Sequence, residues 1–544
     1  IMSDNNDHTE ESFRIKIIHL PRFMGHGQIK KLLSNKLKGI NFRKLKYVNK
    51  ICYLSLTNEN DVEKALEILN KVEIKGKRLD VFRTGEAPDI RKVIKDKPSF
   101  NPNVDVRDIV TPFHHLSYDK QLEEKDKASK EVFNNIIENL NKLNIDSNNI
   151  ELNKILPSPK NKEYRNKNEF NIGYDKDNKP CIGYTGGRFV DGKRVQLPIY
   201  TCTHLTSNTK NIVKVIEEYV KNSPLPIFDE MENKGFWKMI TIRDFIQDTM
   251  LIITTYPQEP EMNETVEKVK QEISNLFFSN TKDFENQECF VSSIYWQVHK
   301  DAFDPKIYTH VAGTPYIYET ILGTRFRLGP AAFFQTNSYG AAVLFETIFK
   351  LSDALRVVNF PEDKNFLFLD ICCGAGAISL TIYNQIIKKN PKLVNTQKIA
   401  IIGVEIVPEA IEDANKNAQE NSIDDKVCKF ITGSAEVVFK NMNKHMPNGF
   451  NFNNESTEVV GVLDPPRAGI NDSVIISIRK LTSMKRLVYV SCDPKAATKN
   501  LVDLCRDTSN KFEGEPFKIK TIQPVDMFPQ TNHFEWKIHH IFVD

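Results

Sequence analysis

The sequence predicts an α/β protein built from three folded parts, and two stretches of the chain carry that prediction. At 544 residues, with 40% hydrophobic side chains, the chain is too long for one core and apolar enough for several. Residues 12–83 alternate strand and helix patterns in the order β-α-β-β-α-β. Residues 366–380 read as an apolar strand, a glycine turn and a helix, the unit of an open parallel sheet. The region between them alternates short strands and helices, which predicts a central α+β domain.

The composition argues against several classes of protein. The 74 basic and 71 acidic residues leave a net charge of +3, so a nucleic-acid surface must come from local charge clusters. The nine cysteines contain no C-x-x-C pair, which argues against a structural zinc or an iron–sulfur cluster. No run approaches the roughly 18 apolar residues of a membrane span, and the polar, acidic start is unlike a targeting presequence. We expect a soluble protein of the cytoplasm or the nucleus, without a metal and without membrane contact.

The first domain is expected over residues 12–83. Its expected elements are strands at Phe13–Leu20, Phe42–Val48, Ile51–Leu56 and Arg78–Phe82 and helices at Gln28–Lys38 and Asn60–Leu69. This order and size are similar to those of an RNA-recognition-motif domain, and also to those of any ferredoxin-like domain. An RNA-recognition motif stacks bases on aromatic residues of its first and third strands, where this chain has Lys16, Ile51 and Tyr53. At most one stacking ring is therefore expected, and sequence readout, weak backbone binding and protein contact all stay open.

Residues 84–112 carry prolines and mixed charge without periodicity, which predicts a linker. The central domain is expected over residues 113–323, beginning with a helix at Tyr118–Leu143 whose charged first half should face solvent.

Residues 160–167 hold four basic side chains against one acid, a cluster that can neutralise RNA phosphates or lie solvated on a loop. Trp237, beside Lys238, suits either stacking on an unpaired base or burial in the core.

The C-terminal domain is expected over residues 324–544, and its glycine turn at Gly374 would let the backbone approach a nucleotide-like ligand. A second apolar strand, Ile399–Glu405, ends on an acid 31 residues after Gly374, where a carboxylate can accept from both ribose hydroxyls. A dinucleotide site instead has a third glycine and an acid about 20 residues further on. The spacing therefore indicates a different nucleotide cofactor.

Three later residues are expected at the same sheet edge as the glycine turn. Asp464 ends a strand and begins a proline-fixed loop, and Glu535 lies in the loop before the last strand. Cys492 lies near the tip of a strand over Leu487–Pro494. The carboxyl ends of parallel strands form the ligand crevice of such sheets, so Cys492 is a candidate nucleophile. The alternative is a small buried side chain, which is what most free cysteines are.

Several motifs occur together in the second half of the chain. They are Ala332-Phe-Phe-Gln-Thr-Asn337, the glycine turn, Val404-Glu405, Asp464-Pro-Pro-Arg, Ser491-Cys-Asp-Pro and Asp526-x-Phe-Pro-x-Thr-x-His-x-Glu535. From about Val110 to its end, the chain resembles the RNA uracil-5-methyltransferase family. Tyr164-Arg-Asn-Lys-x-Glu-Phe170 resembles that family's tRNA-binding segment, and the N-terminal module is similar to that of the eukaryotic tRNA branch. The resemblance implies a Rossmann-like class I S-adenosylmethionine-dependent methyltransferase sheet and a central RNA-binding domain.

By this resemblance the reaction is conversion of a tRNA T-loop uridine, U54 by convention, to 5-methyluridine with S-adenosylmethionine as methyl donor. Cys492 would be the nucleophile and Glu535 the base, with His533 as second choice. The implied cofactor contacts are Gln335, Cys372, Gly374, Glu405 and Asp464. The implied tRNA contacts are Arg165, Lys167, Glu169 and Trp237. Bacterial members have an aromatic residue where Cys372 stands and an asparagine where Ala377 stands, so those cofactor contacts differ here.

The chemistry independently requires these residue types. Carbon 5 of uracil is a poor nucleophile, so a thiolate must first add at carbon 6 to create a carbanion at carbon 5. A base must later remove the carbon 5 proton, so that elimination frees the cysteine. Asp464 could contact the cofactor or the uracil edge, and a polar crevice is expected to raise the thiolate fraction of Cys492. The target base must also be flipped out of folded RNA.

We expect a monomer that binds the tRNA T-arm, with other structured RNA as a further partner. Related ribosomal-RNA enzymes often carry a cysteine-rich iron–sulfur segment, and its absence favours tRNA. An rRNA or mRNA uridine target is one alternative, and a tRNA-binding or folding protein with secondary methylation is another. A cytosine-5 methyltransferase is disfavoured, because that group places a cysteine after the paired prolines, whereas Arg467 follows Pro466 here.

Overall fold

The computed structural model describes residues 13–18, 20, 26–40, 42–48, 51–74, 77–84, 101–187, 194–278, 289–300, 306–360, 364–394, 396, 398–447, 449–450, 456–467 and 469–542. The chain divides into two compact units, residues 1–100 with 187–194 and residues 101–186 with 195–544. The first unit holds the N-terminal domain, and the second holds a central sheet and a C-terminal sheet.

The N-terminal domain is a four-stranded antiparallel sheet with two helices, in the expected β-α-β-β-α-β order. Its elements are β1 (Arg14–Ile18), α1 (His26–Lys36), β2 (Phe42–Val48), β3 (Ile51–Leu56), α2 (Glu59–Leu69), the short hairpin β4 (Glu73–Ile74) and β5 (Lys77–Arg78), and β6 (Asp80–Arg83). The sheet order is β2-β3-β1-β6. Apolar residues from both helices and one sheet face form the core, among them Ile15, Ile29, Leu54 and Val62. The expected last strand begins two residues later than predicted, because the β4–β5 hairpin precedes it.

The opposite face of this sheet carries a row of three side chains. Lys16 on β1 pairs with Tyr53 on β3 and with Phe82 on β6, and directly opposed residues share a face. The Phe82 ring is 52% exposed. Tyr53 is only 5% exposed, so the exposed aromatic ring in this row is Phe82 of the last strand and not the ring expected on the third strand.

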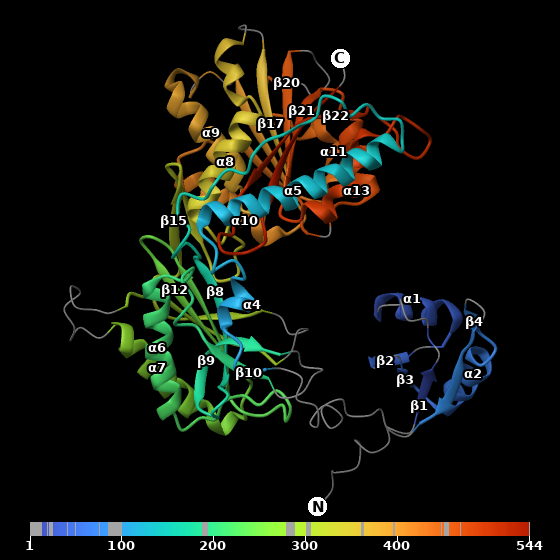
Figure 1. Ribbon diagram of the computed structural model, residues 1–544, viewed down its shortest axis with the longest axis vertical. Coiled ribbons are helices and arrows are strands. Elements are labelled where there is room, and N and C mark those ends of the chain that lie inside the picture. The colour runs from blue at the N-terminus through green and yellow to red at the C-terminus, as the bar shows by residue number, and fades with distance from the viewer. Residues whose placement is uncertain are drawn as a thin grey trace, which may run out of the picture. The chain divides into compact units, whose positions relative to one another are not determined.

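The central sheet has seven strands in the order β10-β9-β8-β11-β12-β13-β14. The elements are β8 (Lys167–Tyr174), β9 (Pro180–Gly186), β10 (Val195–Pro198), α6 (Ser207–Asn222), β11 (Trp237–Asp244), β12 (Thr249–Thr255), α7 (Asn263–Phe278), β13 (Ser293–Val298) and β14 (Tyr308–Gly313). Helix α6 packs on β9 and β11, and α7 packs on β14 (Figure 1). Strand β12 is buried along its whole length, which its run of apolar and β-branched residues permits.

The C-terminal sheet has eight strands in the order β19-β18-β17-β20-β21-β23-β22-β7. The elements are β7 (Glu151–Leu152), the hairpin β15 (Ile317–Ile321) and β16 (Thr324–Leu328), α8 (Ser338–Leu351), β17 (Asn365–Ile371), α9 (Ala377–Lys389), β18 (Ile399–Glu405), α10 (Pro408–Glu420), β19 (Cys428–Thr432), α11 (Ala435–Lys440), β20 (Thr457–Leu463), α12 (Asp472–Arg479), β21 (Met484–Ser491), α13 (Pro494–Cys505), β22 (Phe517–Val525) and β23 (Glu535–Phe542). Strand β23 runs antiparallel between β21 and β22, and the other pairs are parallel. The order reverses at β17, where doubly wound sheets bind their ligands.

Helices cover both faces of the C-terminal sheet. Residues of α8, α9 and α10 pack on one face with side chains such as Phe368 and Val490. Residues of α11, α12 and α13 pack on the other face with side chains such as Leu369 and Tyr489. Among the residues that the structure describes, no helix is long and apolar enough to cross a membrane.

Helix α5 (Tyr118–Asn141), expected to lead the central domain, packs on the C-terminal sheet. Its Val132, Ile136 and Leu140 join the core on the α13 side, and Figure 1 shows α5 lying across this sheet beside α13. The expectation that its charged first half faces solvent is wrong for Lys125, which is fully buried. A short helix, α4 (Val106–Val110), also lies within the predicted linker and is capped by Asp105.

Candidate functional site

The glycine turn joins β17 to α9 at the point where the strand order reverses. Gly374 has a positive φ of 52°, and an added Cβ there would meet no heavy atom within 4 Å. The Glu405 carboxylate at the end of β18 accepts a hydrogen bond from the Gly374 amide at 3.2 Å and another from the Ile406 amide at 2.8 Å. Half-buried Cys372 also has a positive φ, 63°, and its amide donates to the Val404 carbonyl at 2.9 Å. The turn therefore leaves open space lined by backbone beside a fixed carboxylate.

Asp464 lies next to this turn at the end of β20. Its amide donates to the carbonyl of Ile371, the last residue of β17, at 3.2 Å. Burial raises the pKa of the Asp464 carboxyl to about 7, and the nearby Glu535 and Asp370 carboxylates add to that shift, while Lys537 opposes it. Asp464 can therefore exist as a neutral hydrogen-bond donor near neutral pH.

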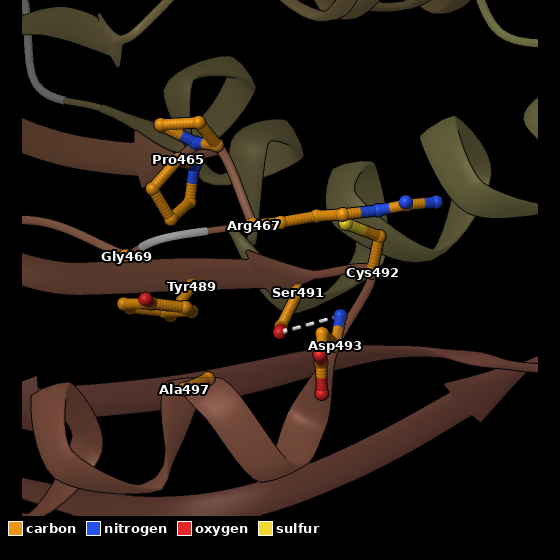
Figure 2. Close-up of a pocket in the computed structure, with 9 residues that line it drawn as sticks. Pro465, Arg467, Gly469, Tyr489, Ser491, Cys492, Asp493 and Ala497 are labelled. Atoms are coloured by element: carbon orange, nitrogen blue, oxygen red, sulfur yellow. Dashed lines mark hydrogen bonds between the residues drawn. The ribbon is translucent and has the colours of Figure 1, made fainter. Parts of the chain in front are cut away.

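Cys492 lies between β21 and α13. Asp493 caps α13 by accepting from the Ala496 amide at 3.1 Å, which fixes the chain immediately after the cysteine. The half-buried Cys492 thiol lines a pocket together with Pro466, Arg467 and Tyr489. Figure 2 shows the Arg467 side chain extending past the Cys492 sulfur.

Burial raises the pKa of the Cys492 thiol, and the Glu535 and Asp464 carboxylates raise it further. Arg467 opposes this rise in pKa through a hydrogen bond and through its charge. The expected rise in thiolate fraction is therefore wrong for the protein alone, because burial of the thiol and the nearby carboxylates outweigh the effect of Arg467 on its pKa. Arg467 is the cation placed to stabilise the thiolate.

Glu535 begins β23, and strand pairing brings it beside Cys492. Ser491 on β21 pairs antiparallel with Trp536 on β23, so the next position outward on each strand holds Cys492 and Glu535. Val525, the last residue of β22, pairs with Glu535 on the other side. The candidate nucleophile and the candidate base thus meet at one sheet edge.

A buried lysine completes this edge. The Lys537 ammonium on β23 lies 3.3 Å from Glu535 Oε2, and both side chains are almost without solvent exposure. His533, the second choice for the base, lies exposed in the preceding loop. The buried position of Glu535 next to a cation makes it the better placed of the two.

The loop with the expected cofactor residue Gln335 lies against the expected RNA-binding segment. The Asn166 side-chain amide donates to the Gln335 carbonyl at 3.1 Å and to the Ser338 hydroxyl at 2.8 Å. The Tyr164 hydroxyl donates to the Pro529 carbonyl at 2.8 Å, within the loop that leads to Glu535. The segment that leads into β8 is therefore hydrogen-bonded to two of the C-terminal motifs, the one with Gln335 and the one with Pro529.

Three of the four expected RNA-binding side chains reach the surface beside this junction. Arg165 and Lys167 are partly exposed, and the Lys167 ammonium pairs with the exposed Glu169 carboxylate at 3.1 Å. Trp237 is the exception, with 0% exposure. Its ring packs edge-on against Phe236 at 4.8 Å between centroids, in the core of the central sheet. The prediction that Trp237 meets RNA is therefore wrong, because neither ring face is open to a base.

Sequence reasoning missed four residues that shape this site. Arg467 ends the Asp464-Pro-Pro-Arg motif without a role predicted for its charge, and Lys537 lies two residues beyond the last motif. Lys125 lies in a charge run, and Asn166 lies inside a basic cluster. Lys537 alone had a usable signal, since the alternation of β23 places residues 535 and 537 on one face. The partners of the other three come from distant segments, which the sequence does not pair.

Comparison with known proteins identifies the family. The sequence model described as tRNA (Uracil-5-)-methyltransferase matches residues 328–540. The tRNA (uracil-5-)-methyltransferase homolog A of Mus musculus is 30% identical over 552 residues, covering 97% of this chain and 84% of its own length. The chain belongs to the tRNA (uracil-5-)-methyltransferase family.

One further relative and one solved structure are also similar to this chain. The tRNA (uracil-5-)-methyltransferase homolog B of Homo sapiens is 30% identical over 446 residues, covering 79% of this chain and 82% of its own. The crystal structure of Pyrococcus abyssi tRNA (uracil-54, C5)-methyltransferase in complex with S-adenosyl-L-homocysteine has the same fold, with a TM-score of 0.53 at 19% identity, covering 92% of this chain and 93% of that chain. As a member of the tRNA (uracil-5-)-methyltransferase family, the protein uses S-adenosylmethionine as methyl donor.

The residues around the glycine turn fit such a cofactor. Gly374 leaves open space, Glu405 presents a fixed carboxylate, and buried Asp370 has one carboxylate oxygen, Oδ1, without a hydrogen-bond partner among the described residues. Within the same residues, no group of three or more His, Cys, Asp and Glu side chains could hold a metal ion.

Proposed function

We propose that this methyltransferase converts the T-loop uridine U54 of tRNA to 5-methyluridine. The observation that carries the proposal is the strand register that brings Cys492, the nucleophile, beside Glu535, the base. The homologs named above and the Pyrococcus abyssi enzyme, named for uracil 54 of tRNA, support the choice of substrate.

Cys492 opens the reaction. Its thiolate adds to carbon 6 of the flipped-out uracil, and the electrons of the carbon 5–carbon 6 double bond move toward carbon 5 and oxygen 4. Arg467 stabilises the thiolate, and Asp464 in its neutral form donates a hydrogen bond to the uracil edge where charge develops. Arg467 thus acts on the negative charge before the addition, and Asp464 acts on the charge that the addition moves onto the uracil.

Gly374, Glu405, Gln335 and Cys372 would hold S-adenosylmethionine, which supplies an electrophilic methyl group to carbon 5. Glu405 would accept from the ribose hydroxyls, and the backbone at Gly374 would line the ligand without a side chain in the way. Glu535 then removes the carbon 5 proton, the double bond re-forms, and the bond from carbon 6 to sulfur breaks.

The RNA surface in this proposal has two parts. Arg165 and Lys167 would contact phosphates of the T-arm, with Glu169 holding the Lys167 ammonium in place. We also propose an RNA-recognition-like role for the N-terminal domain, whose exposed Phe82 ring beside Lys16 suits contact with an unpaired base. The proposed division of the chain is 12–83, 84–112, 113–323 and 324–544, except that α5 and β7 of the third segment pack on the C-terminal sheet. We propose that one copy acts as a monomer.

The decisive experiment incubates the protein, tRNA and S-adenosylmethionine and maps 5-methyluridine by mass spectrometry. Cys492→Ala should abolish the product and leave tRNA binding within about twofold, while Cys289→Ala, at another partly exposed cysteine, serves as the matched control. Product formed by Cys492→Ala would reject the mechanism.

A second experiment separates the alternative substrates and functions. tRNA containing 5-fluorouridine should trap a covalent protein–RNA adduct, because fluorine cannot leave as a cation and the elimination stops. Adduct formed with rRNA or mRNA fragments in place of tRNA would move the proposal to those substrates. Rescue of misfolded tRNA equally by wild type and Cys492→Ala, without product, would favour a folding protein.

A further inference from the structure

Lys537 is a buried cation that the mechanism above leaves without a role. Its side chain is 0% exposed, and its ammonium lies 3.3 Å from Glu535 Oε2. Lysine is almost never fully buried unless it is paired. Residues 535 and 537 lie on the same face of β23, because successive strand residues alternate between faces.

The groups that face Lys537 are mostly acidic. The carboxyls of Glu535 and Asp464 and the thiol of Cys492 all act on it through their charges. On this face of the sheet, α8 presents apolar side chains such as Leu344 and Phe345, while its charged Glu346 and Lys350 pair with each other at the surface, 3.1 Å apart.

The next residue on this face of β23, His539, is kept neutral because burial lowers its pKa to about 4. The strands beside Lys537 present Val490 and Gln523, which carry no charge. Lys537 is therefore the one ammonium beside Glu535 among the described side chains of β21, β22, β23 and α8, while the Arg467 guanidinium acts on the Cys492 thiol from the loop after β20.

We propose that Lys537 is a positioning residue that keeps Glu535 ionised and aimed at the carbon 5 proton during release of the product. This inference rests on the proposed function. Burial alone favours a neutral carboxyl, which cannot accept a proton, and an adjacent ammonium reverses that preference.

The release step explains why a fixed cation suits this place. The Glu535 carboxylate takes the carbon 5 proton, the electrons of that C–H bond form the double bond to carbon 6, and the bond from carbon 6 to sulfur breaks with its electrons on Cys492. Negative charge thus passes from Glu535 to the Cys492 thiolate. Burial lowers the pKa of Lys537, and the charges of Glu535 and Cys492 oppose that change. Because the negative charge only moves from one of these groups to the other, the surroundings of Lys537 carry the same charge before and after the step.

The test measures product release in single turnovers with tRNA, from pH 5.5 to 9. Lys537→Met should slow product release at least tenfold at pH 6.5, so that covalent protein–RNA adduct accumulates and is seen on a denaturing gel. The acidic limb of its pH–rate profile should move to higher pH by one unit or more. Lys537→Arg, which keeps the charge, should restore the wild-type limb. Lys518→Met, on the exposed side of the neighbouring strand β22, is the matched control and should behave as wild type.

Coupling to Glu535 gives the second readout. In a Glu535→Gln background, Lys537→Met should change the release rate by less than twofold, because no carboxylate is left to support. If Lys537→Met does not fold, Lys537→Gln takes its place with the same expected shift. An unshifted acidic limb and unchanged adduct in the neutral variant would overturn the inference while wild type still methylates. Absence of methylation by wild type would reject the proposed function, and this inference with it.

Discussion

Helix α5 holds the loop that leads to Glu535 through a buried ion pair, and breaking that pair should destabilise the protein strongly. The Lys125 ammonium lies 2.6 Å from Asp526 Oδ1, and both side chains are fully buried. Removing one partner of such a pair leaves an uncompensated buried charge, which costs about 3–5 kcal/mol. The Tyr118 hydroxyl and the Phe528 amide still donate to Asp526, at 3.0 and 3.1 Å, which places the cost near the lower end of that range.

Lys125→Met should therefore lower the free energy of unfolding by about 3 kcal/mol, measured by urea denaturation followed by circular dichroism. Lys127→Met, on the same helix, is the matched control, since its ammonium pairs with Glu124 at the surface and its loss should leave the unfolding free energy close to that of wild type. Adding Asp526→Asn to Lys125→Met removes the second charge but keeps an acceptor, and should recover at least about 1 kcal/mol. A loss below about 1 kcal/mol for Lys125→Met would refute a structural role for the pair.

Three further predictions concern the site. Because the pKa of Asp464 is raised to about 7, its contribution to stability is present below pH 4 and is lost as the pH rises through 7. Asp464→Asn should therefore gain stability relative to wild type between pH 4 and 7, by at most about 1.4 kcal/mol per pH unit. A pH-independent difference in urea denaturation would contradict this. Trp237→Phe should lower the unfolding free energy and leave tRNA affinity unchanged, whereas a ring that stacks on RNA would lose about 1–3 kcal/mol of binding. Arg165→Ala and Lys167→Ala should each weaken tRNA binding and reduce its salt dependence in filter binding, while Lys268→Ala, an exposed residue of α7, should not.

The sequence was sufficient for the positions that end strands. Glu405, Asp464 and Cys492 follow short apolar runs, and parallel strands align their carboxyl ends, so their convergence could be predicted from local pattern and topology. The meeting of Cys492 with Glu535 needed the antiparallel register of β21 and β23, which follows from no local pattern.

Burial was the quantity that the sequence did not supply. Trp237 beside Lys238 looked suited to a stacking surface, but the ring turns into the core of a sheet covered by helices. Lys125 looked like one more surface charge, yet the apolar side of α5 carries it inward against Asp526, about 400 positions away in the chain. In both cases the decisive neighbours come from distant segments, and composition alone cannot identify them.

The placement of α5 and β7 also determines how the molecule must fold. Both elements are synthesised well before β22 and the loop before β23, on which they pack. The apolar and charged side chains of α5 and β7 therefore lack their native contacts until β22 and that loop have been synthesised. Such long-range contacts slow folding and expose intermediates to aggregation. Loss of the last 30 or so residues should therefore leave this early segment unable to pack and remove the base, so that truncated chains are both inactive and prone to aggregate.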